Sequence, residues 1–156
     1  MVRVGLISDT HGLLRPEAVR FLRGCDRIIH GGDIGHERIL DELAALAPVT
    51  AVRGNNDHEP WAQRIAETEL VQIEKVWIYV IHDLNQIDID PVAAGVHVVV
   101  SGHSHQPSIE ERGSVMYVNP GSAGPRRFRL PIAAAELIVT GRSVSPRTVE
   151  LDGESS

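Results

Sequence analysis

The chain has 156 residues, of which 42% are hydrophobic, and this is typical of one globular domain with an ordinary core. A formal net charge of −6 argues against a general nucleic-acid binder, because contacts with the phosphate backbone need an excess of lysine and arginine on one face. Cys25 is the only cysteine, which excludes an intramolecular disulfide and a zinc site built from thiolates. The apolar runs are too short to cross a bilayer. We expect one domain over residues 1–151, a polar tail over 152–156, a cytoplasmic location and no membrane partner.

Short runs rich in valine and isoleucine predict buried strands. They lie at residues 2–7, 27–29, 49–52, 76–81 and 96–100. Helical patterns at 15–24 and 35–47 separate the first three runs, so we expect parallel strand–helix–strand units. The later chain predicts more strands, joined to a sheet. These are a strand before Glu74 that pairs with 76–81, a hairpin that turns at 112–114, and strands at 132–139 and 143–151.

Side chains that can bind metal stand just past the end of each of the first five runs. They are Asp9 and His11, Asp33, Asn55, His82, and His103 and His105. In an open α/β sheet, ligands bind beyond the carboxyl ends of the parallel strands, so we expect these side chains to be neighbours. Residues two apart in extended chain point to the same side, so we expect 9 with 11, and 103 with 105, to act as pairs. Glycines 31, 32, 54 and 102 are expected where backbone passes close to an ion.

Seven oxygen and nitrogen ligands exceed what one ion needs when water must also bind, so we expect two divalent ions. A carboxylate can bridge ions roughly 3.5–4 Å apart, and such a pair clamps the attacking and leaving oxygens of a phosphoryl displacement. Asp33, central in the order, is the expected bridge. Ligands without thiolate favour manganese, with zinc, iron and nickel as alternatives. Asn55 is a neutral ligand, so its ion should be lost more easily.

In these motifs the chain resembles the calcineurin-like metallophosphoesterases. The motifs are SDTHG (8–12), GGD (31–33), GNND (54–57), the single His82, and GHSH (102–105). NPGS at 119–122 points to the small bacterial and archaeal phosphodiesterases, which are also similar to the metallophosphoesterase-like subunit of retromer. The resemblance implies a four-layer αββα sandwich, with two mixed β-sheets flanked by helices and a dimetal centre at the rim. It also implies two ligand sets. One is Asp9, His11, Asp33 and His105, and the other is Asp33, Asn55, His82 and His103.

Two positions depart from the family pattern. Larger members usually have, after the metal-binding asparagine, a histidine that is thought to protonate the leaving group, but Asn56 stands here and an amide cannot deliver a proton. Asp57 and His58 are the candidates to replace it, although His58 is equally consistent with a solvated loop residue. Asp83 follows His82 where the subfamily often has glycine, and we expect it either to orient the imidazole or to reshape the pocket entrance.

The predicted function is hydrolysis of a phosphodiester. A metal-bridging hydroxide would attack phosphorus in line, with Asp33, Asn55, His82 and His103 acting through the metals. The alternatives are a phosphomonoesterase or nucleotide phosphatase with the same mechanism, and a non-catalytic protein-interaction module on the same fold. The expected partner is a small phosphate ester, and nucleic acid is expected only as a substrate. The pattern is compatible with a homo-oligomer and leaves the natural substrate open.

Overall fold

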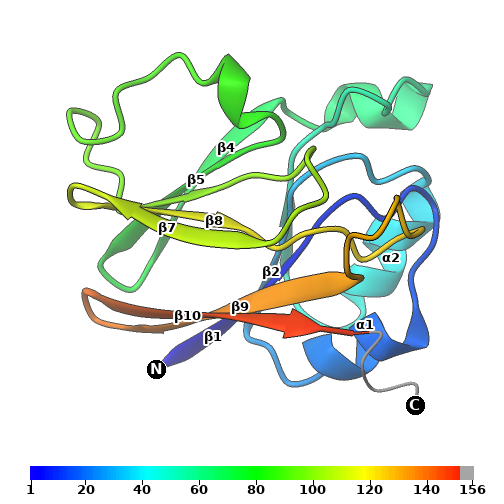
Figure 1. Ribbon diagram of the computed structural model, residues 1–156, viewed down its shortest axis with the longest axis horizontal. Coiled ribbons are helices and arrows are strands. Elements are labelled where there is room, and N and C mark those ends of the chain that lie inside the picture. Colours follow the sequence, from blue (N-terminus) through cyan, green and yellow to red (C-terminus); the bar gives the residue numbers. More distant parts are fainter. Residues whose placement is uncertain (152–156) are drawn as a thin grey trace.

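The computed structural model describes residues 1–151, and the tail expected at 152–156 lies outside them. In this part of the chain, ten strands form two five-stranded sheets that pack face to face (Figure 1). The strand orders are β10-β9-β1-β2-β3 and β4-β5-β6-β8-β7. The two mixed sheets agree with the fold that the resemblance implies.

The first sheet is built around three parallel strands. Its members are β1 (Val2–Ile7), β2 (Arg27–His30), β3 (Val49–Ala51), β9 (Ala133–Thr140) and β10 (Ser143–Glu150). β1, β2 and β3 run parallel, whereas β9 is antiparallel to β1 and β10 is antiparallel to β9. The strand–helix–strand units predicted from the first three runs are therefore confirmed.

Two helices make the crossovers, and both are shorter than the patterns that predict them. α1 (Pro16–Leu22) begins with proline in its first turn, and α2 (Glu37–Ala44) begins where the His36 side chain accepts a hydrogen bond from the backbone N–H of Arg38. Their apolar faces pack with Ile7 and Ile28 in one buried cluster on the first sheet. Within residues 1–151, no helix is long and apolar enough to span a bilayer.

The second sheet carries the strands predicted at 76–81 and 96–100. Its members are β4 (Thr68–Ile73), β5 (Val76–Ile81), β6 (Val98–Val100), β7 (Ser108–Arg112) and β8 (Val115–Asn119). β5, β6 and β8 are parallel, and the antiparallel strands β4 and β7 form the edges. Five ligand-bearing strands thus belong to two sheets, as the resemblance implies, and not to one open sheet.

Apolar side chains from both sheets fill the space between them. Val4, Leu6 and Ile29 of the first sheet meet Ile78 and Val80 of the second, and all five are at most 1% exposed. The outer face of the second sheet is covered differently from the outer face of the first. A one-turn 3-10 helix, η2 (Leu84–Gln86), and the loop after it pack there, so among the described residues the α-helical layer lies on the first sheet alone.

One charged cluster lies on the helix-covered side of the first sheet. Glu136 on β9 accepts hydrogen bonds from Arg3 Nε at 2.6 Å and from Arg147 Nε at 2.8 Å. Arg3 also donates to the carbonyl oxygens of Phe21 and Arg23, at the end of α1. Burial alone would raise the pKa of Glu136, but the two guanidinium groups outweigh it and lower the pKa. Glu136 therefore stays ionised and joins β1, β10 and α1.

Candidate metal centre

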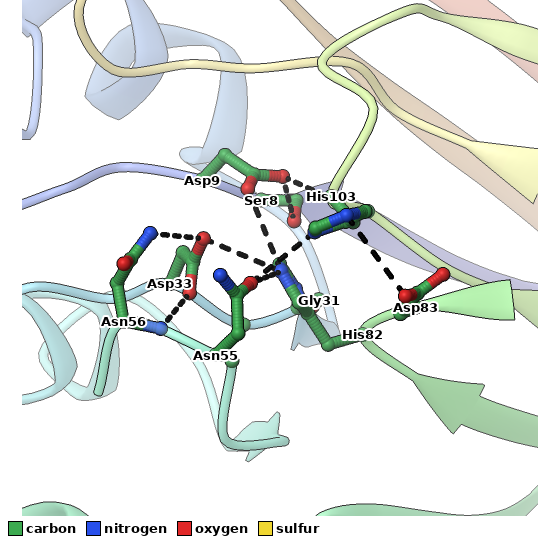
Figure 2. A network of polar contacts seen from close by, with 12 residues as sticks. Ser8, Asp9, Gly31, Asp33, Asn55, Asn56, His82, Asp83 and His103 are labelled. Carbon is green, nitrogen blue, oxygen red and sulfur yellow. Dashed lines mark hydrogen bonds and ion pairs between the residues drawn. The ribbon is translucent and has the colours of Figure 1, made fainter. Parts of the chain in front are cut away.

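The seven predicted ligands lie at one rim of the molecule, beyond the carboxyl ends of parallel strands from both sheets. Figure 2 labels five of them, Asp9, Asp33, Asn55, His82 and His103. The ligand atoms form two groups, and within each group all the atoms lie within 4.8 Å of one another. One group is Asp9, His11 and His105, and the other is Asp9, Asp33 and His82. Asn55 and His103 adjoin the second group, because the Asn55 side-chain oxygen lies 3.0 Å from His82 Nε2 and 3.2 Å from His103 Nδ1.

The paired ligands do not reach the site from extended chain, so that part of the prediction is wrong. Five ligands have left-handed backbone, with φ of 54° at Asp9, 47° at His11, 55° at Asp33, 71° at His103 and 64° at His105. Non-glycine residues rarely adopt this conformation, and strain of this kind is concentrated at functional sites. Backbone hydrogen bonds stabilise the loop after β1, because the N–H of residue 9 donates to the carbonyl oxygen of residue 32 and the N–H of residue 11 donates to the carbonyl oxygen of residue 33.

Gly54 and Gly102 allow backbone to pass directly against the ligand carboxylates. A Cβ atom on Gly54 would overlap both Oδ1 and the backbone nitrogen of Asp33. One on Gly102 would overlap Ser8 Oγ and lie 2.7 Å from Asp9 Oδ2. Both glycines therefore lie against predicted ligand side chains, where a larger residue would not fit.

Asp9 directs one bare carboxylate oxygen into the cluster. Its Oδ2 accepts hydrogen bonds from Ser8 Oγ at 2.7 Å and from the backbone N–H of His103 at 3.1 Å. Its Oδ1 is buried and accepts no hydrogen bond from any described residue. This atom lies 3.4 Å from Nε2 of His105 and 3.9 Å from Nε2 of His82. A buried oxygen without a donor, surrounded by imidazole nitrogens, fits a cation.

Asp33 lies between the two ligand sets. Its Oδ1 accepts from the backbone N–H of Asn56 at 2.8 Å, and its Oδ2 accepts from the Asn56 amide at 3.1 Å. Oδ2 also lies 3.3 Å from His82 Nε2 and 3.8 Å from His11 Nε2. Burial alone would raise the pKa of Asp33, but His82 and Asn56 outweigh it and hold the pKa well below its usual range. An ionised carboxylate between the two sets has the position that a bridge requires.

His82 is fixed in the tautomer that can bind metal. Its Nδ1 lies 2.7 Å from the carbonyl oxygen of Gly31, which can only accept, so Nδ1 carries the proton and Nε2 presents its lone pair. That lone pair faces the oxygens of Asn55 and Asp33. Burial by itself would lower the pKa of His82, but Asp33 and Asp9 raise it. A proton or a metal ion is needed where these electron-rich atoms converge.

His11 and His105 face each other on the opposite side of Asp9. Their Nε2 atoms lie 3.4 Å apart and their ring centroids 5.4 Å apart. Two imidazoles with the same atoms directed at Asp9 Oδ1 form a compact nitrogen and oxygen donor set. With no thiolate in either group, the residues present fit two divalent ions that accept mixed nitrogen and oxygen ligands.

The structure does not bring the two candidate general acids into this cluster. Asp57 is buried, and its carboxylate accepts backbone hydrogen bonds from Ile34 at 3.1 Å, Gly35 at 3.0 Å and Gly54 at 2.9 Å. It therefore joins the loop after β2 to the loop after β3. His58 lies on the exposed side of that loop.

Two residues of NPGS (119–122), a motif that in the sequence indicates only the family resemblance, support the ligand loops. The Asn119 side chain donates to the Gly102 carbonyl at 2.9 Å and to Ser104 Oγ at 3.1 Å. Ser122 Oγ donates to the carbonyl oxygen of Asp9 at 3.0 Å. The motif thus braces the ligand loops after β6 and β1. Its place at the end of a mostly buried strand is the signal that could have indicated this role.

His30, which ends a buried strand, forms a second support together with Thr10. His30 Nδ1 accepts the backbone N–H of Gly32 at 3.0 Å, so Nε2 carries the proton and donates to Thr10 Oγ1 at 3.0 Å. Thr10 Oγ1 then donates to the carbonyl of Ile34 at 2.8 Å. Burial lowers the pKa of His30 to about 4, so the ring is neutral near pH 7. This chain of hydrogen bonds ties the loops that carry Asp9 and Asp33.

Comparison with known proteins agrees with the fold. Residues 2–141 match the calcineurin-like phosphoesterase superfamily domain, and the chain belongs to this superfamily. It is 35% identical to a probable metallophosphoesterase of Methanothermobacter thermautotrophicus, over 90% of this chain and 94% of that protein. It is 30% identical to the phosphodiesterase YfcE of Escherichia coli, over 78% of this chain and 79% of that protein. The fold is similar to that of Vps29 from Chaetomium thermophilum, with a TM-score of 0.78 over 95% of each chain at 16% identity.

Proposed function

We propose that the protein is a phosphodiesterase with a dinuclear metal centre. The observation that carries the proposal is the convergence of bare lone pairs at the rim, with Asp33 Oδ2 between histidines of the two ligand sets. Two divalent ions would supply, when bound, the polarised phosphoryl oxygen and the activated water that in-line attack on phosphorus requires. Asp9, His11, Asp33 and His105 would hold one ion, and Asp33, Asn55, His82 and His103 the other.

A diester is favoured over a monoester by the shape of the site. Two cavities adjoin the cluster, one lined by Asn55 and His82 and the other by His103 and Tyr117, and Asp83 borders both. A phosphate at the centre would place an organic group on either side. Asn56 cannot donate a proton to a departing alkoxide, so the preferred substrates are esters whose leaving group needs little protonation. The 30% identical relative named a phosphodiesterase supports the same choice.

Manganese is the metal that we propose for both positions. The donors are carboxylate, amide and imidazole, which suit manganese, and zinc, iron and nickel bind similar sets. The ion next to Asn55 should be held less tightly, because the amide contributes no charge. Titration of the metal-free protein with manganese should therefore show two affinities.

The test is hydrolysis of bis(p-nitrophenyl) phosphate with and without manganese, in the wild type, Asp33→Asn and Asp41→Asn. Loss of the bridging charge should cost several kcal/mol of transition-state stabilisation, or about 100-fold or more in rate. Asp41→Asn removes the same charge from an exposed position on α2 and should behave like the wild type. Activity that is unaffected by Asp33→Asn, or absent from a wild type that binds the metal, would overturn the proposal.

Two other functions are compatible with the same fold and ligands. A monoesterase would share every ligand, and a series of monoesters and diesters with leaving groups of graded pKa separates the two, because a diesterase turns over the diesters faster at equal leaving-group pKa. A protein-interaction module is supported by the similarity of the fold to Vps29. It predicts bound metal without hydrolysis of either ester class.

We also propose that the protein acts in the cytoplasm on a small phosphate ester. Cys25, the single cysteine, is a buried free thiol that packs with the helices on the first sheet. The chain has no second cysteine with which to form a disulfide, and free thiols are typical of proteins in a reducing compartment. Fractionation of cells with an antibody against the protein tests the location, and recovery outside the cytoplasm would contradict it.

A further inference from the structure

Asp83 presents a fixed carboxylate to one of the predicted ligands. It follows β5 and begins η2, where its Oδ1 accepts the backbone N–H of Asn85 at 3.0 Å. Its Oδ2 lies 3.9 Å from His103 Nε2 (Figure 2). This separation is that of an ion pair and is longer than a hydrogen bond, and the side chain of His103 is 43% exposed.

The His103 ring directs its two nitrogens to different partners. Nδ1 faces Asn55 Oδ1 at 3.2 Å and so points to the ligand cluster, whereas Nε2 faces Asp83. A neutral imidazole has one N–H and one lone pair, and a metal ion binds the lone pair. His103 can therefore serve as a ligand from this position only when the proton is on Nε2.

His82 shows how the same requirement is met elsewhere in the site. Its proton is held on Nδ1 by the carbonyl of Gly31, and its ring is only 5% exposed, so backbone and burial fix its orientation. His103 lies at the solvent side, where water competes for its N–H. A carboxylate that accepts the second N–H of a metal-binding histidine fixes the tautomer and makes the ring a better donor.

We propose that Asp83 is a positioning residue that holds His103 with its proton on Nε2 and its Nδ1 available to the metal ion next to Asn55. This role rests on the proposed dinuclear centre. Asp83 acts through His103 and need not contact the metal. It would strengthen the binding of the ion that has the neutral amide of Asn55 as a ligand.

The test compares Asp83→Asn, Asp83→Ala and the control Asp88→Asn by calorimetric titration of the metal-free protein with manganese. An asparagine can keep the hydrogen bond to Asn85 through its oxygen, but its NH₂ group then faces His103 Nε2 and favours the wrong tautomer. We expect the weaker affinity to fall about 10- to 100-fold in Asp83→Asn, and by less in Asp83→Ala, with the tighter site unchanged. If Asp83 merely capped η2, alanine would be the more harmful change.

Asp88 borders the same cavity as Asp83 and is exposed, so Asp88→Asn removes an equal charge and should leave both affinities nearly unchanged. Zinc-loaded protein with ¹⁵N-labelled histidine gives a direct readout, since His103 should show its proton on Nε2 in the wild type and lose that state in Asp83→Asn. If both manganese affinities are the same in Asp83→Asn as in the wild type, the role of Asp83 is overturned and the dinuclear centre is retained. Fewer than two sites in the wild type would overturn both. Thermal unfolding in chelator checks that each variant is folded.

Discussion

Replacing His30 by asparagine is expected to remove a pH-dependent part of the protein's stability. His30 is fully buried, and its ring accepts from Gly32 and donates to Thr10. An asparagine oxygen can replace Nδ1 as the acceptor, but the amide does not titrate. The variant therefore loses the proton linkage of His30 along with its hydrogen bond to Thr10.

The magnitude follows from the pKa of the buried ring. Burial lowers the pKa of His30 from 6.5 to about 4, although the charge of Asp9 acts in the opposite direction. Because the folded pKa is the lower one, the unfolded chain takes up this proton first as the pH falls. The contribution of His30 to stability is complete above about pH 6.5 and is lost between about 6.5 and 4. Each pKa unit is worth about 1.4 kcal/mol, so the loss is about 2 kcal/mol by about pH 5 and roughly 3 by about pH 4.

The assay is urea unfolding of the metal-free wild type and of His30→Asn across this pH range. At neutral pH the variant should be less stable by about 1–3 kcal/mol, since a donor to Thr10 is gone, and this gap should shrink as the pH falls. Thr10→Val is the matched control. It breaks the hydrogen bond between His30 and Thr10, and also that from Thr10 to the Ile34 carbonyl, but keeps the imidazole, so its deficit should persist at low pH. A gap between wild type and His30→Asn that stays constant from about pH 7 to 5 would refute the reasoning.

Three further outcomes are expected. Gly54→Ala should weaken manganese binding by about 10-fold or more and cost about 1–3 kcal/mol of stability, because its Cβ overlaps Asp33. Titration calorimetry measures the binding, with Gly95→Ala as the control because a Cβ atom there would contact nothing. Equal manganese affinity in the two variants would contradict the predicted effect of the overlap. Glu136→Gln should lower the free energy of unfolding by about 1–3 kcal/mol at neutral pH, because the ionised carboxylate is stabilised by two guanidinium groups. Denaturant curves should show this difference becoming smaller as the pH falls below about 4.5, where the wild-type carboxylate becomes protonated. Asn56→His should speed alkyl diesters more than p-nitrophenyl diesters, by up to about 100-fold, and an equal change in kcat/KM for both would argue against a missing general acid.

The strands and the ligands could be predicted from sequence because both depend on local patterns. Valine-rich runs mark the buried strands, and a polar residue just past each run marks the rim. β6 nevertheless begins at Val98 and not at residue 96, since element ends are decided by pairing, here with β5 and β8. The division into two sheets depends on contacts between distant segments, and the family resemblance supplied it where periodicity did not.

The supporting groups could not be predicted for a related reason. Asp57 stands two residues after the predicted ligand Asn55 and resembles a candidate acid by position, yet its carboxylate accepts hydrogen bonds from backbone N–H groups of two loops. His30 is the last residue of its strand and His82 follows its strand, but the particular partners of the His30 ring, Gly32 and Thr10, depend on the tertiary structure. The left-handed backbone of Asp9 and His103 likewise arises from tertiary hydrogen bonds and leaves no mark in residue spacing.

The ligands come from both sheets, and this makes metal affinity a measure of how the two sheets are aligned. An ion bound by His82 of one sheet and Asp33 of the other would be strained whenever the layers slide. The interior packing that includes Leu6 and Val80 would then help to set which ion is preferred. Substitutions in that interior offer a way to alter metal choice while every ligand remains in place.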